Sequence, residues 1–133
     1  MVIATRCRVI YGDTDNMGVV YYANYLRFFE AGRNEYMRAR GLTYREVEAR
    51  GLALPVTEAR CRYLRPARYD DLVTVETRVT RARGARVVFA YRMLDEQGTL
   101  LAEGETEHGA VGEGGRLVRL PADLIAALAP EEG

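Results

Sequence analysis

Hydrophobic residues between positions 25 and 40 recur with the spacing of one face of an α-helix. The spacing i, i+3, i+4, i+7 and i+11 places their side chains on a single side of a helix; they are Tyr25, Phe28, Phe29, Gly32 and Tyr36. Polar residues fill the opposite face, and Gly41 follows, a residue type that commonly ends helices. The pattern predicts a long amphipathic helix over residues 25–40.

Hydrophobic and polar residues alternate farther along the chain, which is the pattern of β-strands with one buried face. The alternation is clearest over residues 72–81 and 86–94, where the inward positions are Val73, Val75, Thr77 and Val79 in the first stretch and Val87, Phe89, Tyr91 and Met93 in the second. Turn-forming residues separate further stretches that are rich in strand-forming residues. We therefore also predict strands over residues 2–11, 53–64, 99–111 and 116–120.

Two short helices are predicted from their first residues. Thr43, with Glu46 three residues on, forms a capping-box pattern for a helix over residues 43–50. Pro121 opens a last helix whose apolar side is formed by Leu124, Ile125 and Leu128. The order of strand, long helix, short helix and several antiparallel strands predicts an α+β fold in a single domain, residues 1–133. A sheet of five to six strands should wrap around the long helix, the only element large enough to cover it.

The composition excludes several kinds of catalytic site. All nineteen basic residues are Arg, and the chain of 133 residues contains no Lys, Ser or Trp. A serine triad, a lysine Schiff base and a P-loop are therefore excluded, and the single His108 cannot form a multi-histidine metal site. The net charge is zero, so we expect neither nucleic acid nor an anionic membrane as a partner. Carboxylates, Cys, Thr and Tyr remain as candidate catalytic groups.

The sequence predicts a soluble, cytoplasmic protein. Cys7 and Cys61 lack the spacing of a zinc site or of a disulfide framework, so we expect reduced, buried thiols. The first residues lack a secretion signal, and no stretch approaches the roughly 20 apolar residues that a membrane span requires. We expect no metal and no cofactor.

Residues 11–25, with the sequence YGDTDNMGVVYYANY, bring two carboxylates and a glycine to the start of the long helix. Backbone N–H groups in the first turn of a helix have no internal partner, so they can hold an oxyanion while a carboxylate attacks or activates water. Asp15 is the candidate catalytic residue, whereas Asp13 is more typical of a turn or a cap. By residue type Asn24 would be the N-cap, and Gly18 would give the loop a positive φ or access for a substrate.

Four segments together resemble a known family: DTD at residues 13–15, GVV at 18–20, YANYLRFFEA at 22–31 and YLRPARYDD at 63–71. They are similar to the 4-hydroxybenzoyl-CoA thioesterase family of hot-dog folds, and most of all to its short acyl-CoA thioesterase branch, which includes Tol-Pal-associated bacterial enzymes. The resemblance implies an antiparallel sheet wrapped around a central helix, homodimers joined through their sheets and, commonly, homotetramers. It also implies that the long helix begins at Tyr21 or Tyr22, and not after an N-cap at Asn24.

The resemblance further implies roles for particular residues. Asp15 matches the family's catalytic carboxylate, and the backbone N–H of Tyr22 matches the donor that polarises the thioester carbonyl, although the Tol-Pal-associated branch usually has His there. Basic residues of one hairpin would bind the phosphates of CoA; they are Arg81, Arg83 and Arg86. The substrate-binding candidates are Gly18, Val19, Asn24, Tyr25 and Glu30. A core position is the alternative for Tyr25, and a solvated helix face is the alternative for Glu30.

We therefore expect an acyl-CoA thioesterase that releases a short-chain or aromatic acid and CoA. Asp15 would act as a nucleophile or as a general base, and both remain open. One alternative is a hot-dog hydratase or dehydratase, which generally relies on a His near the helix, and another is a non-catalytic acyl-CoA binding module. A Cys7 nucleophile with His108 is a weaker option, because Cys7 lies inside a predicted strand.

Overall fold

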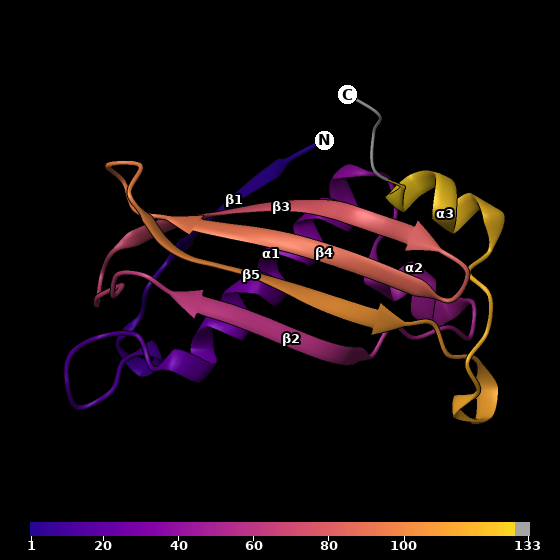
Figure 1. The fold of residues 1–133 in the computed structure, drawn as a ribbon, viewed down its shortest axis with the longest axis horizontal. Helices are drawn as coiled ribbons and strands as arrows, with labels where there is room; N and C mark the ends of the chain where they lie inside the picture. Colours follow the sequence, from indigo (N-terminus) through magenta and orange to yellow (C-terminus); the bar gives the residue numbers. More distant parts are fainter. Residues whose placement is uncertain (130–133) are drawn as a thin grey trace.

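The computed structural model describes residues 1–129 (Figure 1). Its main elements are one antiparallel sheet and a long helix that lies across one face of this sheet. The sheet has the strand order β1-β3-β4-β5-β2, and every neighbouring pair is antiparallel. The strands are β1 (Ile3–Arg8), β2 (Val56–Tyr63), β3 (Leu72–Arg83), β4 (Arg86–Leu94) and β5 (Leu100–Gly109). This is the α+β arrangement that the sequence predicted.

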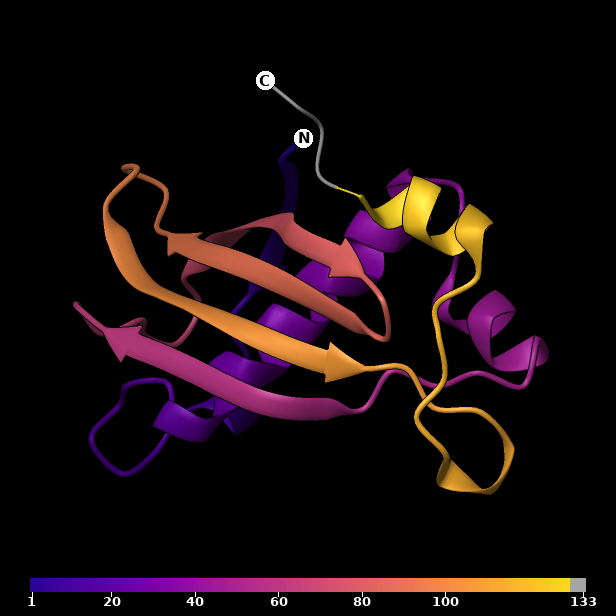
Figure 2. The ribbon, with the colours of Figure 1, turned by 45° about the vertical axis from the view of Figure 1, so that its right-hand side comes forward.

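The helix α1 (Tyr25–Ala39) follows a single 3-10 turn at Tyr22–Asn24 and runs behind the sheet (Figure 2). Two short helices, α2 (Tyr44–Ala49) and α3 (Ala122–Leu128), lie at the end of the sheet where α1 finishes. The predicted capping box begins α2, because the Glu46 amide donates to Thr43 Oγ1 over 3.2 Å and the Thr43 amide donates to the Glu46 carboxylate over 3.4 Å. Further 3-10 turns occur at Tyr11–Asp13 and Glu113–Gly115.

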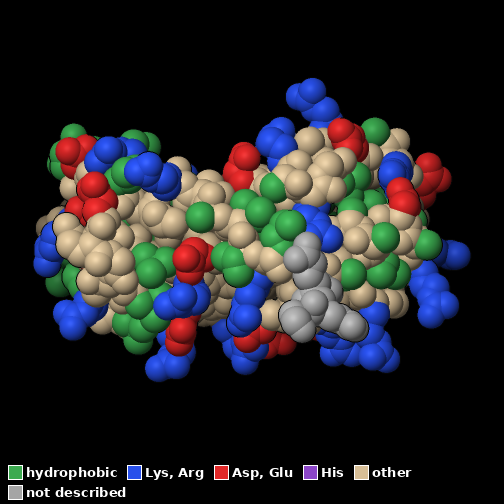
Figure 3. All heavy atoms as spheres, turned by 90° about the horizontal axis from the view of Figure 1, so that it is seen from above, with side chains coloured by type: hydrophobic (Ala, Val, Ile, Leu, Met, Phe, Trp, Pro, Cys, Tyr) green, Lys and Arg blue, Asp and Glu red, His purple; other side chains and the backbone are tan. Residues whose placement is uncertain are grey.

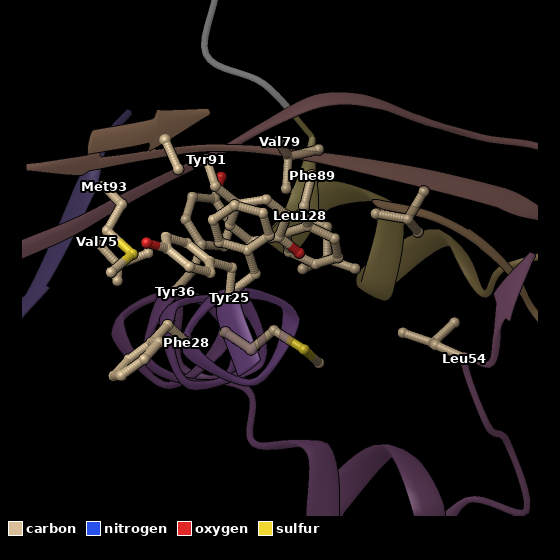
Figure 4. Packing of buried hydrophobic residues seen from close by; sticks show 14 of the residues in the cluster. Tyr25, Phe28, Tyr36, Leu54, Val75, Val79, Phe89, Tyr91, Met93 and Leu128 are labelled. Atoms are coloured by element: carbon tan, nitrogen blue, oxygen red, sulfur yellow. The ribbon is translucent and has the colours of Figure 1, made fainter. Parts of the chain in front are cut away.

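Aromatic side chains from α1 and from the sheet form the core between them (Figure 4). The rings of Phe29 and Tyr91 stack with their centroids 4.4 Å apart, and Tyr36 meets Phe89 edge to face at 6.0 Å. Every predicted inward position of α1, β3 and β4 is buried. The hydrophobic periodicity therefore identified the buried face of each of these elements correctly.

The α1 backbone comes very close to the sheet at Gly32. A Cβ atom at this position would lie 2.5 Å from Thr77 Oγ1 and 2.7 Å from Val75 Cγ1, and real Cβ atoms do not approach other heavy atoms so closely. The missing side chain therefore lets the helix backbone pack directly against β3. This contact sets the height of α1 above the sheet.

The outer face of the sheet is polar and carries ion pairs between neighbouring strands. Their N–O distances run from 2.8 to 3.5 Å; the pairs are Arg60 with Glu105, Arg62 with Glu103, Arg92 with Glu76 and Arg86 with Glu107. Exposed pairs of this kind contribute less than about 1 kcal/mol each. Arg and acidic side chains are also interspersed on the face seen in Figure 3. Basic and acidic residues therefore do not form separate patches on this face.

One predicted strand does not form. Residues 116–120 are not a strand, so the sheet has five strands within residues 1–129, and the six-stranded alternative is wrong. The Val118 amide donates to the Ala110 carbonyl and the Leu120 amide to the Gly84 carbonyl, over 2.9 and 2.8 Å. Bonds to such separate partners cannot build a continuous ladder. The other predicted elements are present, with their ends shifted by a few residues.

Candidate active site

The loop between β1 and α1 folds back on itself and carries Asp15 near its tip. The Asp15 amide donates to the Val19 carbonyl over 2.9 Å, and the Gly18 amide donates to the Asp15 carbonyl over 3.0 Å. Gly18 has a φ of 78°, as predicted, and this conformation closes the turn. The Val20 amide donates to the Ala67 carbonyl over 2.8 Å, so the loop is held against the connection between β2 and β3.

Asp13 holds this loop onto the first turn of the helix. Its side chain is buried, and Oδ2 accepts a hydrogen bond from the Ile10 amide over 2.9 Å. Oδ1 forms an ion pair with Arg27. The Asp13 backbone carbonyl accepts from the Asn24 carboxamide over 2.9 Å and from the Tyr21 amide over 2.9 Å. The interpretation of Asp13 as a turn and capping carboxylate is therefore confirmed.

The Asp15 carboxylate is half-buried and has one oxygen available. Oδ1 accepts from the Met17 amide over 2.8 Å, whereas Oδ2 has no hydrogen bond within the described residues. Asp15 lies close enough to Tyr21 for its negative charge to act on the Tyr21 hydroxyl. The pKa of Tyr21 is raised mainly by the hydrogen bond between its hydroxyl and Tyr22, and to a small extent by the negative charge of Asp15.

The 3-10 turn next to Asp15 presents free amides. Within residues 1–129 the N–H groups of Tyr22 and Ala23 have no acceptor, as expected for the first turn of a helix. Tyr22 is 62% exposed, and its carbonyl accepts from the Tyr63 hydroxyl over 2.9 Å. Burial and a hydrogen bond to Cys61 raise the pKa of Tyr63 to about 12, so this hydroxyl stays protonated and keeps donating. The Tyr21 amide, directly before this turn, donates to the Asp13 carbonyl, so the free amides are joined to the loop that carries Asp15.

The start of the helix differs from the prediction based on residue type. Asn24 precedes α1, but its side chain makes no capping bond to the helix amides, because its carboxamide is bound to the Asp13 carbonyl. The helical turn begins at Tyr22, as the family resemblance implied, in 3-10 form, and α1 itself begins at Tyr25. Tyr25 is buried in the core, and its hydroxyl accepts from the Ala67 amide over 3.1 Å. Asn24 and Tyr25 thus hold the Asp15 loop and the segment around Ala67 in place through these hydrogen bonds.

Glu30 lies about two turns farther along the helix from Tyr22. Its side chain is exposed and pairs with Arg33 at 3.5 Å. It lines a separate cavity of about 370 Å³ at the second half of α1. The structure therefore brings Asp15, Gly18, Val19 and Tyr22 together and leaves Glu30 apart from them.

The three arginines predicted to bind CoA lie far from Asp15. Arg81, Arg83 and Arg86 are exposed on the hairpin between β3 and β4, at the end of the sheet opposite to the Asp15 loop (Figure 1). The twelve residues of β3 separate the two regions, about 40 Å at 3.3 Å per residue. Arg86 pairs with Glu107 at 3.5 Å, whereas Arg81 and Arg83 form no ion pair with the described residues. One chain alone does not bring these arginines to Asp15.

The proposed thiol site does not form. Cys7 is on β1 and His108 is on β5, and β3 and β4 separate these strands in the sheet. The ring of His108 is instead hydrogen-bonded to Thr106 and to the Leu54 carbonyl. Burial raises the pKa of the Cys7 thiol, which disfavours the reactive thiolate. A Cys7 nucleophile activated by His108 is therefore excluded.

Sequence reasoning missed Tyr63 and the backbone at Ala67 as supports of the site. Both lie about forty residues after the loop that they hold, so no local spacing connects them with Asp15. The available signal was the segment over residues 63–71, which carried part of the family resemblance.

Comparison with known proteins identifies the family. Residues 9–128 match the Thioesterase-like superfamily. The acyl-CoA thioesterase YbgC of Haemophilus influenzae is 38% identical over 123 residues, which cover 90% of this chain and 89% of that protein. The structure of the Thermus thermophilus protein TT1821 has a TM-score of 0.90 at 40% identity, over 95% of this chain and 96% of the other. A 4-hydroxybenzoyl-CoA thioesterase in complex with 4-hydroxybenzoyl-CoA has a TM-score of 0.86 at 26% identity, over 96% and 99%.

The chain therefore belongs to the Thioesterase-like superfamily and has its hot-dog fold, which confirms the family and fold inferred from the sequence. Among residues 1–129, no helix combines the length and the apolar character needed to cross a membrane. Within the same residues, no three His, Cys, Asp or Glu side chains gather into a group that could hold a metal ion.

Proposed function

We propose that the protein hydrolyses acyl-CoA thioesters, with Asp15 as the catalytic carboxylate and the Tyr22 amide as the oxyanion donor. The observation that carries this proposal is a carboxylate with one free oxygen on a loop that is hydrogen-bonded to a helical turn with free amides. Donors fixed in advance at the position where negative charge develops are among the strongest catalytic devices in acyl transfer. The names of the related proteins, acyl-CoA thioesterase and 4-hydroxybenzoyl-CoA thioesterase, support the same activity.

The reaction adds an oxygen to the thioester carbon and expels CoA as a thiolate. The carbonyl oxygen becomes negative as this bond forms, and the Tyr22 amide stabilises it. The thiolate is a good leaving group, so one carboxylate and one donor are sufficient, without a triad. Asp15 either attacks the carbon and forms a mixed anhydride, which water then hydrolyses, or removes a proton from the attacking water. No cofactor is required, because CoA is part of the substrate.

The substrate is a short-chain or aromatic acyl-CoA. Gly18 and Val19 would border the acyl group from the loop, and Asn24 and Tyr25 would keep the loop in place through their bonds to Asp13 and Ala67. Glu30, farther along the helix, would contact the end of a longer acyl group. Exposed aromatic rings around the turn suit an aromatic acyl group, since Tyr22 lies 4.7 Å from the Tyr21 ring and 6.4 Å from the Tyr63 ring.

A cytoplasmic homodimer joined through the sheets, and a homotetramer built from it, complete the proposal. Within the described residues β2 pairs only with β5, so its other side is an open edge. An open edge supports pairing with the same strand of a second copy about a two-fold axis. The CoA phosphates would bind the hairpin arginines Arg81, Arg83 and Arg86, which a second copy would supply.

Purified protein should release free thiol from acyl-CoA in a colorimetric assay. Asp15→Asn should lower kcat about 100-fold or more while the circular dichroism spectrum stays unchanged. Single-turnover hydrolysis in heavy-oxygen water tests the nucleophilic role, because label in Asp15 arises only when water opens the mixed anhydride at the Asp15 carbonyl carbon, whereas a general base never acquires label. Binding of acyl-CoA without thiol release would favour the non-catalytic module, and addition of water to an enoyl-CoA would favour the hydratase.

A further inference from the structure

Tyr63, the last residue of β2, is hydrogen-bonded to the backbone of the 3-10 turn that carries the proposed oxyanion donor. Its hydroxyl donates to the Tyr22 carbonyl over 2.9 Å, and the same carbonyl accepts from the Tyr25 amide. Both lone pairs of this carbonyl oxygen are therefore in use. The bond connects a short turn before α1 to a strand of the sheet that lies far from it in the sequence.

The sheet and two aromatic rings fix the position of this hydroxyl. The Leu64 amide, directly after Tyr63, donates to the Leu101 carbonyl of β5 over 2.9 Å. The Tyr63 ring meets the Tyr25 ring edge to face at 5.0 Å and the Tyr22 ring at 6.4 Å, which are favourable distances for aromatic pairs. A phenylalanine at this position would keep the ring contacts and lose only the hydroxyl.

The Tyr22 carbonyl belongs to the same peptide group as the Ala23 amide. A peptide group is planar and trans, so its N–H points opposite to its C=O. A bond that fixes the carbonyl therefore also fixes the direction of the Ala23 N–H, which has no acceptor within the described residues. The Tyr22 N–H belongs to the preceding peptide group, whose Tyr21 carbonyl accepts from the Asn24 amide over 2.8 Å. The Ala23 amide is thus held through a side chain, and the Tyr22 amide through the backbone.

We propose that Tyr63 is a positioning residue for the hydrolysis, because its hydroxyl orients the Ala23 amide so that this amide joins the Tyr22 amide in binding the thioester oxygen. This role rests on the proposed function. The hydroxyl also polarises the peptide group and so strengthens its N–H as a donor. The thioester oxygen becomes negative only as the new C–O bond forms, so the second donor acts mainly in the chemical step.

The first test is Tyr63→Phe in the whole protein, measured by thiol release from benzoyl-CoA. The value of kcat should fall about three- to tenfold, the effect of one neutral hydrogen bond, whereas KM should change less than twofold. Tyr69→Phe is the matched control and should leave both constants unchanged, because Tyr69 is 57% exposed and its hydroxyl has no hydrogen bond within residues 1–129. An unchanged kcat in Tyr63→Phe, or a raised KM at unchanged kcat, would overturn the proposal.

The amide signals in NMR spectra distinguish positioning from a general loss of structure. In Tyr63→Phe the amide proton of Ala23 should move upfield, because its peptide group is less polarised. The amide proton of Tyr22 should move less, since it belongs to the preceding peptide group. An unmoved Ala23 signal, or equal shifts of both signals, would contradict the assigned role of Tyr63.

Replacement of Ala23 by lactic acid tests the amide itself, because it exchanges the N–H for an ester oxygen and keeps the side chain. This change should lower kcat about tenfold or more, and an unchanged kcat would overturn the proposal even if Tyr63→Phe did not fold. Tyr63 acts through this amide, so Tyr63→Phe should lower kcat much less in the ester protein than in the wild type. Two independent losses that multiply would count against the proposal.

Asp15→Asn separates a failure of this proposal from a failure of the proposed function. Loss of thiol release in Asp15→Asn, together with an unchanged kcat in Tyr63→Phe, would refute the role of Tyr63 and leave the function standing. A wild-type protein that releases no thiol from any acyl-CoA would refute the proposed function and this role with it.

Discussion

Asp13 and Asp15 are separated by one residue, yet their carboxylates lie in different surroundings. Asp13 is buried and bound to the Ile10 amide and to Arg27, whereas Asp15 has one free oxygen at the surface of the loop. The difference arises from the backbone, because Asp13 ends the 3-10 turn at Tyr11–Asp13, whereas Asp15 begins the turn that Gly18 closes. Substitution of Asp13 should therefore affect mainly stability, and substitution of Asp15 should affect mainly activity.

Asp13→Ala should lower the free energy of unfolding by about 2 kcal/mol, because it removes a buried carboxylate that accepts from the partly buried Ile10 amide and pairs with Arg27. Asp15→Ala should change it by less than about 1 kcal/mol, since it removes a single bond to a solvent-exposed amide. Urea unfolding at pH 7.5, with thiol release measured on the same samples, distinguishes the two. An Asp15→Ala variant that is the less stable of the two would contradict this assignment.

The buried His108 predicts a particular dependence of stability on pH. Burial lowers its pKa in the folded protein, and the positive charge of Arg33 acts in the same direction. Below about pH 6.5, the ordinary pKa of the side chain, the unfolded chain therefore binds more protons than the native state. The contribution of His108 to stability is present above this pH and is lost as the pH falls. Urea unfolding at pH 7.5 and 5.5 should show a larger loss for the wild type than for His108→Gln.

At the scale of the elements, Gly32 should be a sensitive position. Alanine improves helix propensity by about 1 kcal/mol, but its Cβ would overlap Thr77 and Val75 in the sheet, and such overpacking costs about 1–3 kcal/mol. We expect a net loss of about 1–2 kcal/mol for Gly32→Ala in urea unfolding. Gly12→Ala is the matched control, since a Cβ there would meet nothing within 4 Å. Unchanged or raised stability of Gly32→Ala would show that α1 can move away from β3.

Most elements could be predicted because their sequence patterns report burial directly. The period of α1 and the alternation in β3 and β4 are consequences of packing on one face, and the Thr43 capping box is a local contact. Residues 116–120 also look like a strand, but strand formation depends on a neighbour that the local sequence does not specify. The support of the Asp15 loop by Tyr63 and Ala67 has the same long-range origin. Only the resemblance to a family connected these segments in advance.

At the scale of the whole molecule, the two halves of the proposed substrate site lie at opposite ends of the sheet. The loop that carries Asp15 lies before the start of α1, whereas the hairpin of Arg83 and Arg86 joins β3 and β4 at the far end of the sheet (Figure 1). No rotation of side chains can span the length of β3. If both regions serve one acyl-CoA molecule, they must come from different copies of the chain. Combined Arg83→Ala and Arg86→Ala substitutions should then raise KM for acyl-CoA and largely spare kcat, because the phosphates do not take part in the chemical step.

Mixed dimers test this arrangement directly. A chain with Asp15→Asn and a chain with Arg83→Ala and Arg86→Ala, co-expressed with different tags and purified through both, should recover activity at low acyl-CoA concentration beyond the sum of the two parents. Recovery is expected because one site of each mixed dimer combines an intact Asp15 from one chain with intact arginines from the other. Tagged dimers in which both chains carry Asp15→Asn control for the tags. If the arginines served the Asp15 of their own chain, both sites of every mixed dimer would be defective, and activity would not exceed that sum.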